Sequence, residues 1–179
     1  MSPLSELAQK LRAQLTAPGA PFETVEAEVD GRAVRVYRNA FPTLPALIAS
    51  ARTHGGKPFI RYQGETWTFD RFFAEADAVA GQLRAWGVQP GERVAIAMRN
   101  RPEWAVVFAA AALIGAVPAP LNSFGLGEEL HAALDDVSPR VFACDAERLA
   151  RIGGDTRVAG CRILCVGDVD VPAGVADYR

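Results

Sequence analysis

Several polar residues stand where they could contact a ligand, each directly after an apolar stretch of the chain. They are Asn100 and Arg101, Asn122 and Ser123, Asp145, and Gly167 with Asp168. If the apolar stretches are parallel strands, these residues share the carboxyl edge of one sheet, which is where open α/β sheets bind ligands. Asn100, Asn122 and Ser123 are therefore the candidate binding residues.

The same positions also suit purely structural roles, and that interpretation is favoured. Asn100 and Asp145 precede predicted helices and are common capping types. Asn122 suits a turn, because its side chain can bond to the backbone two residues on. Arg101 is expected to point into solvent.

The cysteines and histidines lack the spacing of a catalytic or metal site. Cys144, Cys161 and Cys165 fall in or beside predicted strands, and their odd number argues against a disulfide framework. The Cys161–Cys165 spacing is not the usual metal knuckle. His54 in a predicted loop and His131 on a predicted helix are expected at the surface. The sequence therefore predicts buried thiols, no metal site and no catalytic residue.

Two nucleotide-binding patterns are incomplete or absent. Residues 55–58 read Gly-Gly-Lys-Pro, but a phosphate loop needs Ser or Thr after its lysine, at the start of a helix. No predicted strand is followed by Gly-x-Gly-x-x-Gly. A small Rossmann-like nucleotide binder therefore ranks last among the functions considered.

The elements that would position the polar residues begin with a strand, a helix and a second strand. Val94–Met98 is apolar without alternation, which is typical of a strand buried on both faces. Pro102 suits the first turn of the helix, and Gly115 suits its end. The second strand is predicted at Val117–Leu121. A strand-helix-strand unit of this length implies a right-handed parallel crossover.

A membrane span is the competing interpretation of this stretch. Trp104–Leu121 carries no charge and reaches the ~18 residues at which a spanning helix becomes a candidate. Gly115, Pro118 and Pro120 interrupt the run, however, so its helical part is too short. The sequence predicts no transmembrane segment.

Further apolar stretches alternate with helical patterns. Strands are predicted at Arg140–Cys144 and Cys161–Val166. This alternation predicts an α/β fold with three layers, a mostly parallel sheet and helices on both faces. We assign residues 41–167 to this α/β subdomain. Residues 168–179 show no clear pattern and are assigned as a linker or truncated end.

A long amphipathic helix is predicted to cover the sheet. Gln63-Gly64 indicates a hairpin turn before it, and Thr68 offers a hydroxyl cap to its first turn. Its apolar side chains recur at helical spacing from Phe69 to Trp86. We interpret this aromatic stripe as core.

Residues 1–40 are expected to form a cover of one helix and one antiparallel hairpin. Leucines from Leu4 to Leu15 recur at helical spacing. Asp30-Gly31 predicts a type I′ turn, which fixes the hairpin register and places Glu26 opposite Arg35. Such a charge pair contributes roughly 0.2 to 1 kcal/mol.

Length and composition indicate one globular domain. The chain has 179 residues, half of them hydrophobic and 22% charged, with a formal net charge of -2. No basic face suggests a nucleic-acid partner. The first residues lack the apolar core of a secretory signal, so a cytoplasmic location is expected.

Four motifs carry a resemblance to a known family. GVQPGERVAIAMRNRPEW followed by LIGAVPAPLN resembles the amino-terminal subdomain of AMP-forming acyl-CoA synthetases, relatives of luciferase and of peptide-synthetase adenylation domains. TWTFDRFF and GLGEELHAALDDVSPRVFACD are similar to the family's flanking motifs. Their order and spacing fit from Phe41 to Val166.

Two positions depart from the family pattern. Leu126-Gly127 replaces a common Thr-Pro pair, so a weaker helix cap is expected there. Arg101 replaces a common serine, which leaves Asn100 as the nearest residue able to cap the helix.

The resemblance implies a reaction for the complete enzyme. Such enzymes join a carboxylate to AMP, release diphosphate and transfer the acyl group to coenzyme A, using ATP and Mg²⁺. The hairpin and the following NAFPTLPALI are most similar to members acting on medium to long fatty acids. The family's phosphate loop, which ends Pro-Lys-Gly, has no match here. The chain is therefore expected to be the leading third of a synthetase.

The leading hypothesis is a scaffold and pocket wall that is inactive without the remainder of the synthetase. The alternative is a stand-alone, non-catalytic interaction module. A reading frame continuing past Arg179 into a Pro-Lys-Gly loop would favour the first, and a stop codon the second. Apolar surface left uncovered would also promote self-association into a homo-oligomer.

Overall fold

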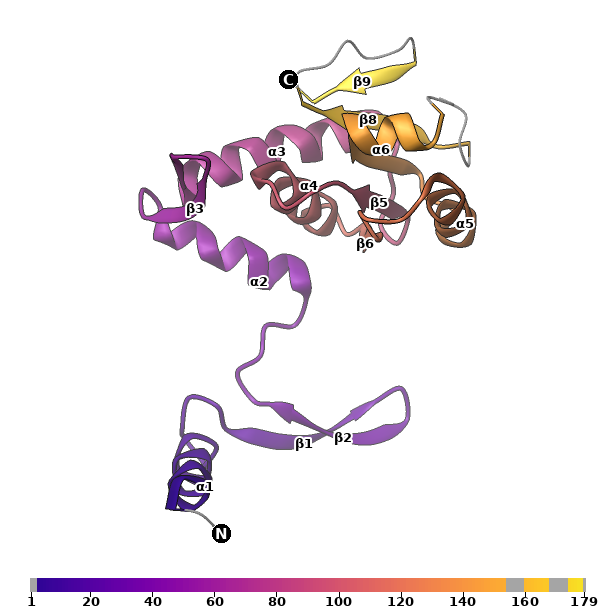
Figure 1. Ribbon diagram of the computed structural model, residues 1–179. Helices are drawn as coiled ribbons and strands as arrows, with labels where there is room; N and C mark the ends of the chain where they lie inside the picture. The colour runs from indigo at the N-terminus through magenta and orange to yellow at the C-terminus, as the bar shows by residue number, and fades with distance from the viewer. Residues whose placement is uncertain (1–2, 154–159, 168–173, 179) are drawn as a thin grey trace. The chain divides into compact units, whose positions relative to one another are not determined.

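The computed structural model describes residues 3–153, 160–167 and 174–178 (Figure 1). The chain divides into two compact units, Met1–Pro42 and Thr43–Arg179. Helix α1 (Pro3–Leu15) and strands β1 (Thr24–Val29) and β2 (Arg32–Tyr37) belong to the first unit. The remaining described elements belong to the second.

The hairpin β1–β2 has the register predicted from its turn. Asp30 and Gly31 both take positive φ, 49° and 73°, as a type I′ turn requires. Glu26 pairs with Arg35 across the strands, and their side chains approach to 3.4 Å. Both side chains are exposed, so this ion pair adds little stability.

Helix α1 lies where the leucine spacing predicts a helix. It contains no buried residue, and its leucines at positions 4, 7, 11 and 15 are 45 to 79% exposed. The cover role expected for residues 1–40 therefore stays a prediction.

The second unit opens with short elements that lead into the long helix. They are α2 (Leu44–Ser50), the 3-10 helix η1 (Ala51–His54), β3 (Pro58–Tyr62), β4 (Glu65–Thr68) and α3 (Phe69–Ala85). Strands β3 and β4 pair antiparallel around Gln63 and Gly64, which have φ of 48° and 84°. Thr68 Oγ1 accepts a hydrogen bond from the backbone N of Arg71 at 3.2 Å. The predicted second hairpin and the predicted cap are both confirmed.

A parallel sheet forms the centre of the second unit. Its strands are β5 (Arg93–Ala97), β6 (Val117–Pro120), β7 (Val141–Asp145), β8 (Arg162–Val166) and β9 (Val175–Asp177). They lie in the order β6-β5-β7-β8-β9, and every neighbouring pair is parallel. The predicted parallel arrangement of the first four strands is confirmed.

The fifth strand corrects the sequence analysis. Three residues of the segment assigned as a linker, Val175–Asp177, pair with β8 in the register Ile163 to Val175. A strand this short carries no recognisable pattern of its own. Its pairing depends on the backbone N–H and C=O groups that the edge of β8 presents.

Helices cover both faces of the sheet, as predicted. Helices α3 and α4 (Pro102–Leu113) pack with alternate sheet residues such as Val94 and Ile96 in one apolar cluster. Helices α5 (Gly127–Val137) and α6 (Ala146–Arg151) contribute to a second cluster around Phe142. The three-layer α/β fold is thus confirmed.

The helices of the first cluster contain the predicted core residues. On α3 the buried side chains include Phe72, Phe73 and Leu83, so the aromatic stripe is core. On α4 the four alanines Ala109–Ala112 are at most 3% exposed. No helix in the described part of the chain is long and apolar enough to cross a membrane.

Candidate functional site

The order of the strands identifies one point of the sheet as the place to look for a site. The chain runs from β5 outward to β6 and then returns to the other side of β5 to form β7. Connections therefore diverge from the carboxyl ends of β5 and β7. In open α/β sheets such a switch point forms the ligand crevice.

The carboxylate of Asp145 bridges these two strand ends. Its Oδ2 accepts a hydrogen bond from the backbone N of Arg99 at 3.0 Å, just beyond β5. Its Oδ1 accepts one from the backbone N of Arg148 at 3.0 Å, which caps α6. The predicted capping role is confirmed. The link to Arg99 was not foreseen, because it depends on which strands become neighbours.

Arg148 is the partner of Asp145 and is the largest fully buried side chain in the described chain. Its Nη1 lies 3.1 Å from Asp145 Oδ2 and 2.8 Å from Glu147 Oε2. Its Nε donates to the carbonyl oxygen of Ser123 at 2.7 Å. Arg148 is 1% exposed, and a charge so deeply buried is tolerated only when it is paired and hydrogen-bonded. The side chain therefore joins the loop after β6 to the end of β7.

Arg151 reinforces the loop that follows β6. Its Nη1 donates to the carbonyl oxygens of Gly125 at 2.8 Å and Ser123 at 3.3 Å. Asn122 Oδ1 accepts a hydrogen bond from the backbone N of Phe124 at 3.0 Å. Asn122 thus braces a turn, as predicted, and the carbonyl of Ser123 serves as an anchor for two arginines.

Close packing explains one departure from the family pattern. A Cβ at Gly127 would overlap the carbonyl oxygen of Arg151, so only glycine fits at this position. Leu126 supplies no side-chain cap to α5, as expected. Glu129 Oε2 instead accepts a hydrogen bond from the backbone N of Leu126 at 2.7 Å, which satisfies one donor at the start of the helix.

The predictions for Asn100 and Arg101 need correction. The residue in the N-cap position of α4 is Arg101, and no side chain caps the helix there. Arg101 does not point freely into solvent, because its Nε lies 2.9 Å from Glu103 Oε2 and its side chain is 24% exposed. The hydrogen bond to Glu103 raises the pKa of Arg101. Asn100 is exposed at the edge of the sheet.

The fold brings some of the candidates together. The loop that contains Ser123 lies near Asp145 through Arg148, and the guanidinium of Arg99 sits 3.9 Å from the centre of the Phe124 ring. Gly167 approaches Arg101. Asp168 lies outside the described residues. Sequence reasoning missed Arg148, because an arginine on a short predicted helix ordinarily points to solvent.

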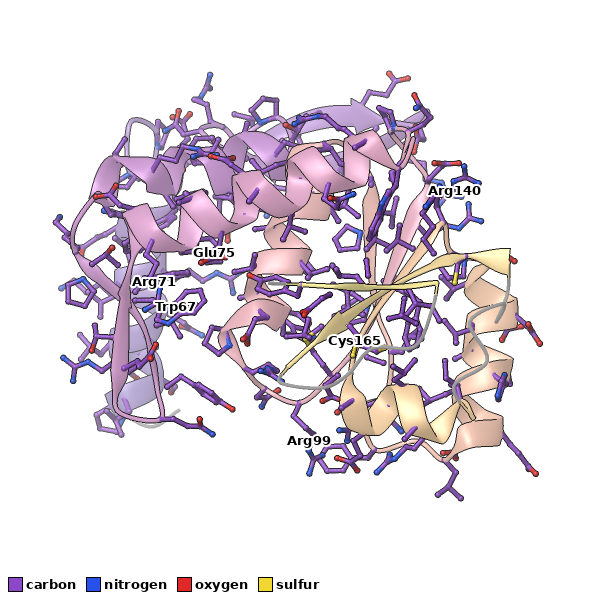
Figure 2. All side chains as sticks on the ribbon, turned by 90° about the horizontal axis from the view of Figure 1, so that it is seen from above. Trp67, Arg71, Glu75, Arg99, Arg140 and Cys165 are labelled. Atoms are coloured by element: carbon purple, nitrogen blue, oxygen red, sulfur yellow. The ribbon has the colours of Figure 1, made fainter. Side chains whose placement is uncertain are left out.

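The cysteines are buried thiols, as predicted. Cys144 and Cys165 are neighbours in the β7–β8 register, and none of the three cysteines forms a disulfide (Figure 2 shows Cys165 within the sheet). The Cys144 thiol donates a hydrogen bond to Cys165, which raises the pKa of Cys144 and lowers that of Cys165. Burial raises the pKa of Cys161. His54 is exposed against the ring of Phe69.

Within the described part of the chain, no three His, Cys, Asp or Glu side chains converge as metal ligands. The cations at the carboxyl edge contact protein groups: Arg101 binds Glu103, Arg148 binds Asp145, and Arg151 binds Glu147.

Comparisons with known proteins agree on one family. The family model described as "AMP-binding enzyme" matches residues 47–174, well over half of the chain. A medium/long-chain fatty acid–CoA ligase of Mycobacterium tuberculosis is 29% identical over 124 residues, which cover 67% of this chain and 21% of the ligase. An L-proline–[L-prolyl-carrier protein] ligase of Streptomyces coelicolor is 31% identical over 102 residues, 56% of this chain and 19% of that protein.

Solved structures show the same fold. A long-chain-fatty-acid CoA ligase of Rhodopseudomonas palustris superposes with a TM-score of 0.67 and 25% identity, over 76% of this chain and 35% of the ligase. An anthranilate CoA ligase in complex with anthranoyl-AMP gives a TM-score of 0.69 at 21% identity, over 76% of this chain and 27% of that one.

This chain therefore spans about a fifth to a third of these relatives. The resemblance seen in the sequence motifs is confirmed by the family model and by the fold. The chain belongs to the AMP-binding enzyme family of adenylate-forming ligases.

Proposed function

We propose that the chain is the amino-terminal part of an AMP-forming acyl-CoA synthetase and that it forms no acyl-adenylate alone. The complete enzyme would convert ATP, a carboxylic acid and coenzyme A into acyl-CoA, AMP and diphosphate, in the cytoplasm. Within it, residues 41–167 together with strand β9 would be a scaffold, and residues 1–40 a cover. The remainder of the synthetase would supply the contacts to ATP, Mg²⁺ and coenzyme A.

One observation carries this proposal. Asp145 and Arg148 at the switch point are bound to each other and to backbone groups, and so hold the end of β7 to the segments that follow β5 and β6. Stabilising a pentavalent phosphorus needs cations and backbone donors aimed at the phosphates. Three cations at this edge, Arg101, Arg148 and Arg151, already form ion pairs within the fold, so this edge is suited to support such a site.

The wall of an acyl pocket is the second part of the proposed role. A hollow of about 430 Å³ is lined by the polar residues Arg61, Asn100 and Arg101 together with Ile60, Tyr62, Pro102, Trp104 and Ala105. The likeness to a medium/long-chain ligase supports fatty acids as the substrate class. Exposed Phe124 and Leu126, 71 and 70% accessible, would be covered by the rest of the enzyme or by self-association.

The decisive assay is carboxylate-dependent exchange of labelled diphosphate into ATP by the purified 179-residue protein. We expect no exchange above a no-protein blank, because losing even one preorganised donor can cost ~10² to 10³ in rate. The Mycobacterium tuberculosis ligase serves as the positive control. Exchange that survives repurification would contradict the proposal.

A chimera tests the scaffold role directly. Residues 41–167 would replace the matching segment of the Mycobacterium tuberculosis ligase, and exchange would be measured with octanoate. We expect a folded chimera to regain exchange. A chimera that is folded by circular dichroism and binds ATP, but forms no adenylate, would contradict the scaffold role.

A further inference from the structure

The loop that follows β6 presents two large apolar side chains to solvent. Phe124 and Leu126 are 71 and 70% exposed, more than any other large hydrophobic residue described in the second unit. Single exposed apolar residues are common on protein surfaces. A contact site is indicated only if the loop holds these two side chains in a fixed arrangement beside groups that a partner could use.

The backbone of this loop is held in place by side chains. The backbone N atoms of Phe124 and Leu126 donate hydrogen bonds to side-chain oxygens at 3.0 and 2.7 Å. The carbonyl oxygens of Ser123 and Gly125 accept hydrogen bonds from two arginines of α6 at 2.7 and 2.8 Å. A loop fixed in this way loses little conformational freedom when it binds a partner, which favours binding.

The side chain of Arg99 accompanies the exposed Phe124 ring. Its guanidinium carbon lies 3.9 Å from the centre of that ring (Figure 2 labels Arg99). No carboxylate among the described residues pairs with this guanidinium. A partner that covers Phe124 therefore also meets an unpaired positive charge, and a carboxylate on the partner would form a charge-assisted hydrogen bond there.

A hollow of about 730 Å³ opens on the other side of the same loop. Leu126 lines it together with the first turn of α5 and the end of α6. Two of its charged groups are engaged, because Glu129 binds the backbone of Leu126 and Arg151 binds Glu147. The carboxylate of Glu128, which also lines the hollow, is exposed and has no partner among the described residues.

The exposed ring and the hollow are complementary in shape and charge. One carries an aromatic anchor with an unpaired cation, and the other offers an apolar wall with an unpaired carboxylate. Because both belong to one surface, two copies of the chain related by a twofold axis can each supply both. Aromatic side chains that enter a pocket of the partner typically dominate the binding energy of an interface.

We propose that this face is a self-association surface, at which Phe124 enters the hollow beside Leu126 of the partner subunit and Arg99 pairs with Glu128 of the partner subunit. The inference rests on the function proposed above, in which these side chains are covered by the rest of the enzyme or by self-association, and it names the second. A chain that stays monomeric would overturn it without bearing on the diphosphate-exchange assay.

Sedimentation velocity of the purified 179-residue protein, over about 5 to 500 μM, measures the association. The contact is small beside a stable interface, so we expect a weak dimer with a dissociation constant of about 10 to 100 μM. No larger species should form, because a twofold contact closes on itself. A monomer throughout this range, or growth beyond the dimer, would overturn the proposal.

Variants of the apolar residues locate the contact. Phe124→Ser should weaken the dimer about tenfold or more, because it removes the side chain that enters the hollow. The control is Leu7→Ser with Leu11→Ser, which removes exposed leucines of α1 and should leave association unchanged. A dimer that is lost in the α1 variant and kept in Phe124→Ser would place the contact on α1 and refute the proposal.

A charge exchange tests the ion pair without any question of misfolding. Arg99→Glu and Glu128→Arg should each weaken the dimer about tenfold, because each brings like charges together across the contact. Both positions are exposed, so the core stays intact. The double variant should dimerise within about threefold of the wild type, since it restores opposite charges. A double variant as weak as the single ones would show that Arg99 and Glu128 do not meet.

Discussion

The two hairpins of the chain are built by the same kind of turn but differ in what they bury. Asp30-Gly31 and Gln63-Gly64 both place a non-glycine residue and then a glycine at positive φ. The β3–β4 hairpin buries Trp67 to 6% exposure, under the guanidinium of Arg71. No residue of β1 or β2 is buried. Turn chemistry thus fixes a register, whereas burial depends on a partner surface.

This contrast predicts which substitutions will lower the free energy of unfolding most. The largest effect is expected far from either turn. Arg148→Ala should lower the free energy of unfolding by about 3 to 5 kcal/mol, because it leaves the buried Asp145 carboxylate without its partner. Urea denaturation measures the change. The double variant Asp145→Asn with Arg148→Met removes both charges and should cost less. An Arg148→Ala variant with the wild-type urea midpoint would show that the Asp145–Arg148 ion pair does not contribute to stability.

The hairpins themselves provide the next test. Trp67→Ala should cost about 3 kcal/mol, because it removes a buried indole from the main core. Tyr37→Ala, at a 57% exposed position of β2, is the matched control and should change stability by less than about 0.5 kcal/mol. Equal losses in the two variants, measured by urea denaturation, would refute the contrast in burial.

A smaller effect is expected in the alanine run of α4. Ala110 is fully buried, so Ala110→Leu should overpack the contact with the sheet and cost roughly 1 to 3 kcal/mol. Ala74→Leu, at an exposed position of α3, tests the same change without burial. An unchanged urea midpoint for Ala110→Leu would mean that the α4 site is roomy.

The smallest effect is expected from substitutions of the two turn glycines, which compare the hairpin turns directly. Gly64→Ala and Gly31→Ala each force a Cβ into a left-handed conformation, at φ of 84° and 73°, which costs about 1 kcal/mol. Only Gly64→Ala should lower the unfolding midpoint of the second unit. Gly31→Ala should change only the amide exchange of β1 and β2. If Gly31→Ala shifts that midpoint as much, the two units do not unfold separately.

Local signals explain what the sequence could predict. The turn residues at positions 30–31 and 63–64 determine the hairpins, and the hydroxyl of Thr68 and the carboxylate of Asp145 cap their helices as their types suggest. The same reasoning finds the apolar strands, because burial on both faces leaves an unbroken apolar run.

Features that depend on distant partners could not be predicted in this way. Strand β9 exists because β8 offers an edge, and Arg148 is held between the loop at Ser123 and the end of β7 at Asp145. Asn100 was assigned as a cap by residue type, yet the helix begins one residue later than that role requires. The first two outcomes depend on which strands become neighbours, which no short stretch of sequence encodes.

The position of β5 in the sheet has a consequence for folding kinetics. Both of its partners come later in the chain, and Val94 pairs with Val141 almost fifty positions on. Hairpins close in about 1 to 10 μs, whereas pairings between distant segments are intrinsically slow. During synthesis, the apolar β5 strand therefore stays unpaired on one edge until β7 has been made. This waiting period is when the nascent protein is most prone to aggregate.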